Sequence, residues 1–135
     1  MPETAAPISV KSLDHVTLVV KDLEASKDFY CGLLGMEDVP RPGFSFAGKW
    51  FQAGATQIHL IEEHDESGPA GEVRDGEPSS RKHHHAFLVE DVRSAFEAAK
   101  SAGALIVSEP KKRPDGAVQL FLQDPDGYIV ELCQP

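Results

Sequence analysis

The chain has 135 residues, of which 41% are hydrophobic, and its formal net charge is −9. This length suits one domain with a shared core, and so acidic a chain lacks the cationic surface that nucleic acid requires. No apolar run approaches the roughly 18 to 20 residues of a membrane-spanning helix. We therefore expect a small-molecule partner, with neither nucleic acid nor membrane.

Few features point to export from the cell. Residues 1–9 lack the charged start and apolar centre of a secretory signal. The two cysteines, Cys31 and Cys133, are too few for a disulfide framework. We expect a cytoplasmic protein whose residues 1–12 form a short tail.

The first half opens with a strand followed by a helix. Residues 14–20 are rich in β-branched side chains, which favour strands. Asp22 is a suitable N-cap for the helix that follows, and Gly35 is placed to end that helix.

Further strands are predicted at residues 44–50 and 57–61, which are parted by Gly54. The second strand of this half is only weakly marked. Residues 62–82 are polar and rich in glycine, proline and acidic groups, which predicts a long loop between two halves.

The second half repeats this order of elements. Residues 84–89 predict a strand, and the apolar spacing of residues 92–99 predicts a helix before Gly103. Three strands follow, at residues 104–107, 117–123 and 128–133, and the last two are joined by the turn sequence Asp124-Pro-Asp-Gly127. Three basic residues read as solvated loop charges: Lys111, Lys112 and Arg113. Each half thus predicts a βαβββ unit, and the chain an α+β fold.

The repeat extends to individual residues. His84 follows His15 by 69 residues, and Glu131 follows His59 by 72, a difference that one loop insertion explains. Three further pairs share the shift of 69: Val20 with Val89, Asp22 with Asp91, and Leu23 with Val92.

Strand alternation and the repeat select four side chains for one site. In the run of three histidines at 83–85, only His84 aligns with His15. His59 and Glu131 share the equivalent place on the last strand of each half. The other histidines, at positions 64, 83 and 85, are read as structural or surface residues.

The four candidates, His15, His59, His84 and Glu131, predict a divalent metal site. Glu131 lies in a strongly apolar strand, where an unpaired carboxylate is costly and a cation would neutralise it. Imidazole and carboxylate donors suit Zn²⁺, Ni²⁺, Co²⁺, Fe²⁺ or Mn²⁺, and this ligand set is typical of catalytic rather than structural sites. The donors alone do not choose a reaction.

Four segments of the chain resemble the vicinal oxygen chelate (VOC) superfamily, which comprises glyoxalases, bleomycin resistance proteins and extradiol dioxygenases. They are Asp14–Val20, Phe29–Gly35, His84–Val89 and Phe121–Glu131. The resemblance covers residues 13–134, as module one (13–62), a connecting loop (63–82) and module two (83–134).

The resemblance implies two βαβββ modules forming a curled mixed sheet around a metal-binding cleft, usually in a homodimer. It places metal ligands at His15, His59, His84 and Glu131. Lactoylglutathione lyases have a glutamate where this chain has His59, which is a departure from that pattern.

Three functions follow from the resemblance. The first is a metal-dependent, glyoxalase-like lyase or isomerase of a small oxygen-bearing substrate, with Glu131 or His59 as the base. The second is a ferrous extradiol-type dioxygenase that uses His15, His84 and Glu131 as its facial triad. The third is a binding or resistance protein without catalysis.

Overall fold

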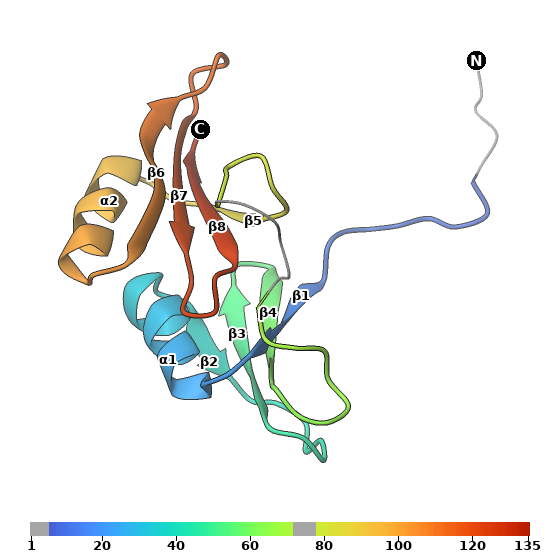
Figure 1. Ribbon diagram of the computed structural model, residues 1–135. Coiled ribbons are helices and arrows are strands. Elements are labelled where there is room, and N and C mark those ends of the chain that lie inside the picture. Colours follow the sequence, from blue (N-terminus) through green and yellow to red (C-terminus); the bar gives the residue numbers. More distant parts are fainter. Residues whose placement is uncertain (1–5, 72–77) are drawn as a thin grey trace.

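The computed structural model describes residues 6–71 and 78–135. Two four-stranded sheets, one from each half of the chain, carry the helices on one side, and residues 6–14 extend away from this body (Figure 1). The predicted α+β fold, with two curled mixed sheets, is confirmed. Residues 1–5 of the predicted tail and 72–77 of the predicted loop lie outside the described residues.

The first sheet has the strand order β1-β4-β3-β2. Its strands are β1 (His15–Val20), β2 (Glu37–Val39), β3 (Gly48–Ala53) and β4 (Thr56–Glu62). β1 runs parallel to β4, whereas β3 is antiparallel to both of its neighbours. β1 therefore occupies one edge of the sheet.

The second sheet repeats this arrangement as β5-β8-β7-β6. Its strands are β5 (His85–Leu88), β6 (Leu105–Lys112), β7 (Val118–Gln123) and β8 (Ile129–Gln134). β5 is parallel to β8, and it is an edge strand like β1.

Each first strand leads into a helix through an aspartate cap. Asp22 accepts from the amides of Glu24 and Ala25 at α1 (Leu23–Lys27), which continues as the wider turn η1 (Asp28–Leu33). Asp91 does the same at α2 (Val92–Ser101). These caps satisfy amides that the first helical turn leaves free, so the sequence repeat extends to the capping hydrogen bonds.

The helix side of both sheets forms one core. Leu18, Ile58, Leu120 and Val130 are buried there, as alternating residues of four strands. Alternation places His15, His59, His84 and Glu131 on the opposite face of their strands. We call that opposite face of each sheet its open face.

Hydrogen bonds hold the two halves in a fixed relation. The Tyr30 hydroxyl donates to Asp124 Oδ2 at 2.7 Å, and the Tyr128 hydroxyl donates to the Val19 carbonyl at 2.8 Å. The Lys21 amide adds a bond to Asp126 Oδ1 at 3.0 Å. The turn between β7 and β8 is therefore fastened to the first half at three points.

Two predicted elements differ from the structure. The strand predicted at 44–50 is β3, which begins only at Gly48, because residues 44–46 belong to the connection from β2. Lys111 and Lys112 lie at the end of β6 rather than in a loop. Pro110 lies on this edge strand where the β6–β7 register shifts between Ser108 and Lys111, so its missing amide hydrogen costs no ladder bond.

Asp124 makes the stability of the protein depend on pH. Burial raises the pKa of Asp124 to about 6, against 3.8 for a free carboxyl. Between these values the folded protein holds a proton that the unfolded chain releases, so stability falls as pH rises. Relative to Asp124→Asn, the wild type should lose up to about 3 kcal/mol of unfolding free energy from pH 4 to 7, measured by urea denaturation.

Asp115→Asn provides a control of opposite sign. The Arg113 guanidinium lowers the pKa of Asp115 to about 2, so this carboxylate adds stability that is lost as pH falls towards 2. If the unfolding free energies of the wild type and of Asp124→Asn changed with pH in the same way, burial of the Asp124 carboxyl would not reduce stability as pH rises.

Candidate functional site

The strand register places the four predicted ligands at equivalent positions. His59 on β4 pairs with Thr17 on β1, and Glu131 on β8 pairs with Ala86 on β5. His15 and His84 each precede those partners by two residues, so they share the same face. We call His15 with His59 the first pair, and His84 with Glu131 the second pair.

The first pair is a stack of rings on the open face of the first sheet. The His15 and His59 rings lie 3.9 Å apart, and Trp50 stacks on the other side of His59 at 4.0 Å. His59 Nε2 donates to Gln57 Oε1 at 2.7 Å, and His15 Nδ1 lies 2.8 Å from Asp14 Oδ2. Each imidazole thus has one nitrogen engaged by an acceptor, which leaves its other nitrogen for a ligand.

The second pair joins a histidine to a buried carboxylate. Glu131 is only 6% exposed, and its Oε1 lies 3.0 Å from His84 Nε2. The Gln119 amide donates to the other carboxylate oxygen at 2.9 Å. Gln119 therefore fixes the orientation of Glu131.

The geometry of His84 fits a metal ligand. Its Nδ1 lies 2.7 Å from the Lys82 carbonyl, which only accepts, so Nδ1 carries a hydrogen. Either the ring is an imidazolium that also donates to Glu131, or the Nε2 lone pair and the carboxylate converge on one point. The second arrangement needs either a proton on Glu131 or a cation between the two groups, and metal-bound histidines usually donate their other N–H in this way.

Burial lowers the pKa of His59, and the positive charge that His15 can carry lowers it further. Both effects favour the neutral imidazole, which is the form that binds metal.

The two pairs remain separate in a single chain. Within residues 6–71 and 78–135, no three histidine, cysteine, aspartate or glutamate side chains lie close enough to hold one metal ion. Each half of the chain thus brings together two of the four predicted ligands.

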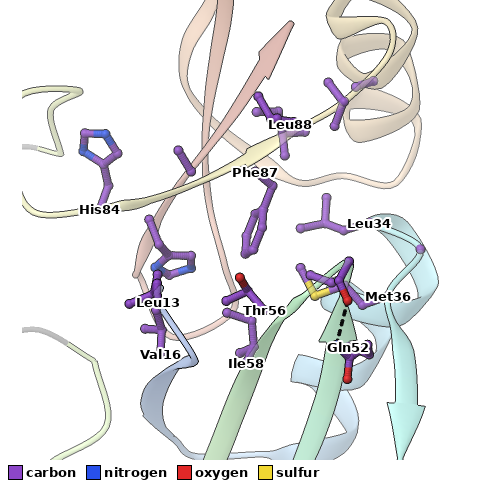
Figure 2. Close-up of a pocket in the computed structure, with 18 of the residues that line it drawn as sticks. Leu13, Val16, Leu34, Met36, Gln52, Thr56, Ile58, His84, Phe87 and Leu88 are labelled. Atoms are coloured by element: carbon purple, nitrogen blue, oxygen red, sulfur yellow. Dashed lines mark hydrogen bonds between the residues drawn. The ribbon is translucent and has the colours of Figure 1, made fainter. Parts of the chain in front are cut away.

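A hollow of about 830 Å³ is lined by residues of both halves (Figure 2). Val16 and Ile58 contribute from the helix side of the first sheet, and Leu34 and Met36 from beyond η1. Strand β5 lies across from them. His84, the residue before β5, also lines the hollow. The lining is mainly apolar.

The remaining histidines have other contacts. His64 stacks on Phe46 at 5.5 Å, and His85 Nε2 lies 3.4 Å from the Tyr30 hydroxyl. Sequence reasoning missed Gln57, Gln119 and Trp50, which contact the predicted ligands. Gln57 shares a strand and a face with His59, but Trp50 and Gln119 lie on the neighbouring strands β3 and β7, and strand pairing cannot be read from one strand.

Comparison with known proteins shows consistent relatives. The chain is 34% identical over 131 residues to an ethylmalonyl-CoA/methylmalonyl-CoA epimerase from Cereibacter sphaeroides, covering 90% of this chain and 96% of the relative. It is 30% identical over 128 residues to a lactoylglutathione lyase from Neisseria meningitidis, covering 89% and 88% of the two chains.

Solved structures share the fold. A glyoxalase family protein from Bacillus anthracis superposes with a TM-score of 0.72 at 22% identity, over 96% of this chain and 98% of the other. A lactoylglutathione lyase from Agrobacterium tumefaciens gives a TM-score of 0.67 at 21% identity, over 96% of both chains. No helix of the described residues is long and apolar enough to cross a membrane.

The family profile described as the Glyoxalase/Bleomycin resistance protein/Dioxygenase superfamily matches residues 12–132, nearly the whole chain. Together with the paired βαβββ sheets, this match shows that the protein belongs to that superfamily.

Proposed function

We propose that this protein is a metal-dependent lyase or isomerase that moves a proton at a carbon beside a polarised oxygen of a small substrate. The observation that carries the proposal is the second pair, a buried carboxylate converging with a histidine nitrogen. Proton transfer needs a base of fixed position, and the Gln119 hydrogen bond holds Glu131 in place.

The metal would be held by His15, His59, His84 and Glu131, whose donors suit Zn²⁺, Ni²⁺, Co²⁺, Fe²⁺ or Mn²⁺. When bound, such an ion polarises a substrate oxygen and acidifies the adjacent C–H group. The neutral form of His59 that burial favours supports this assignment.

Glu131 and His59 are the proposed catalytic residues. They occupy equivalent positions on β8 and β4, so each would approach a shared substrate from its own sheet. To take the proton on the carboxylate oxygen that faces His84, Glu131 would leave or share the metal during turnover. Its burial excludes water, which strengthens its interaction with the developing charge.

The names of two relatives support the class of reaction. One is a lactoylglutathione lyase and another an acyl-CoA epimerase. An epimerase inverts one stereocentre, which requires a bond at that carbon to be broken and remade. A base beside a polarised oxygen suits such chemistry.

We further propose that the site is completed in a homodimer, where the first pair of one chain meets the second pair of its partner. The contacts of Tyr30 and Tyr128 fasten the two halves of one chain. These contacts hold the two pairs apart in one arrangement, and a second copy could supply the missing pair without changing it.

The surface supports a dimer as well. β1 and β5 are edge strands, and an edge strand can pair with a strand of another chain. Leu13 and Leu88, beside and on these strands, are 65% and 76% exposed and line the hollow. In a twofold dimer the same contact forms twice.

The proposed domain comprises residues 13–134, with modules 13–62 and 83–134 joined by the loop 63–82. A cytoplasmic location is part of the proposal, and the free thiols of Cys31 and Cys133 are consistent with it.

The shared site predicts complementation between two inactive variants. His15→Ala/His59→Ala protein and His84→Ala/Glu131→Gln protein should each lose bound metal, because each keeps only two ligands. Co-expressed in equal amounts, they should regain about a quarter of the wild-type metal, since half of the dimers are mixed and each mixed dimer has one intact site. Mass spectrometry of metals on protein without histidine tags measures this.

His64→Ala is the matched control, because its ring lies outside both pairs and should leave the metal content unchanged. Two variants that each retain full metal would contradict the ligand assignment. Metal lost in both but never regained on mixing would place the site within one chain.

Glu131→Gln should abolish proton exchange at carbon. Incubated in D₂O with lactoylglutathione or methylmalonyl-CoA, metal-loaded wild type should place deuterium beside the carbonyl of the accepted substrate. The variant should be at least about 100-fold slower, since general-base catalysis contributes roughly that much. Nuclear magnetic resonance (NMR) follows the exchange.

Glu97→Gln, on the exposed surface of α2, is the control and should exchange at the wild-type rate. Exchange in Glu131→Gln at the wild-type rate would refute Glu131 as the base. Oxygen uptake with catechols, in place of exchange, would favour the dioxygenase alternative.

A further inference from the structure

The connection between β2 and β3 continues the ring stack of the first pair. Trp50 stacks on His59 at 4.0 Å, and the Phe44 ring lies 6.3 Å from Trp50. Phe46 stacks on Phe44 at 5.3 Å. A row of aromatic rings thus leads from a proposed metal ligand to the loop at residues 40–47.

A guanidinium group stands over the far end of this row. The Arg41 Cζ lies 4.7 Å from the centre of the Phe44 ring and 5.0 Å from that of Phe46. Its Nη2 donates to the Phe46 carbonyl at 3.0 Å. These contacts hold the guanidinium in one place.

Gly48 leaves space for this arginine. A Cβ at position 48 would lie 2.9 Å from Arg41 Nη2 and against the Leu60 carbonyl, so a larger residue would displace one of them. The guanidinium therefore lies against the first residue of β3, two residues from Trp50.

Arg41 differs from the nearby lysines in lacking a carboxylate partner among the described residues. Lys27 and Lys49 approach the Asp38 carboxylate at 3.5 Å and 3.7 Å. Among the described residues, no carboxylate lies within 4.0 Å of the Arg41 guanidinium.

We propose that Arg41, Phe44, Phe46 and Trp50 form a carboxylate subsite for the substrate. This inference rests on the proposed function, because the substrate oxygens would meet the metal beside His59. A planar, unsaturated or aromatic segment would lie along Phe44, which is 47% exposed, and a carboxylate at its far end would bind Arg41. Guanidinium matches a carboxylate with two parallel hydrogen bonds.

A purely structural role for Arg41 gives a different expectation. If the guanidinium only holds the loop through Phe46, ligands with and without a charge should bind equally. Discrimination between a carboxylate and its neutral amide therefore separates the two roles.

The test compares 4-hydroxybenzoate with 4-hydroxybenzamide by isothermal titration calorimetry on metal-free protein. The two ligands share a ring and differ in one charged group. Wild type should bind the carboxylate roughly tenfold more tightly, the size expected of one charge-assisted hydrogen bond. Arg41→Gln should bind both equally, and tryptophan fluorescence of Trp50, the sole tryptophan, should report the same difference.

Lys49→Gln is the matched control, because Lys49 is a neighbouring cation paired with Asp38. This variant should keep the full preference for the carboxylate. Equal binding of the two ligands by wild type, or equal losses in Lys49→Gln and Arg41→Gln, would overturn the subsite.

A second arm separates failure of the subsite from failure of the proposed function. Zinc-loaded protein should bind 3,4-dihydroxybenzoate, whose vicinal oxygens can chelate the ion, more tightly than 4-hydroxybenzoate. If the protein takes up no zinc, the proposed function fails while the metal-free comparison still decides the subsite. If zinc binds and Arg41→Gln keeps the preference for the carboxylate over the amide, the subsite alone is wrong.

Discussion

A carboxylate buried in an apolar strand is the constraint on which the rest of this structure depends. Glu131 lies between Val130 and Leu132 on β8 and is almost fully covered. Burying an unpartnered charge costs several kcal/mol, so the fold must supply partners. Gln119 and His84 do so, and the Lys82 carbonyl in turn fixes the ring of His84.

The duplicated fold explains why such partners are available. The same strand position that carries Glu131 in the second half carries His59 in the first, where the partner is His15. Both positions face away from the helices, because the alternating residues of these strands form the core. One face of these strands thus packs in the core, and the opposite face carries the residues of the proposed site.

The orientation of the two halves bears on whether one chain or two would form the proposed site. The turn between β7 and β8 is fastened to the first half through Asp124, Asp126 and Tyr128, and these contacts fix the two sheets with β1 and β5 at their edges. In the proposed homodimer a second chain would complete a centre that uses both pairs, and the exposed Leu88 would lie at its interface.

Much of this could be predicted from the sequence, because repeats and alternation are local patterns. The βαβββ order, the Asp22 cap and the shared face of each ligand pair follow from such patterns. The start of β3 could not be predicted, since Phe44 and Phe46 have strand-forming side chains yet pack on Arg41 in a loop. The separation of the pairs could not be predicted either, because it depends on how the Tyr30–Asp124 contact orients the halves.

The most direct test of the four-ligand site is a zinc titration followed by NMR of the histidine ring nitrogens. If all three histidines bind the same ion, the signals of His15, His59 and His84 should shift together and be saturated by one zinc ion per chain. Shifts confined to one pair, or saturation of the two pairs by separate ions, would contradict a single shared site.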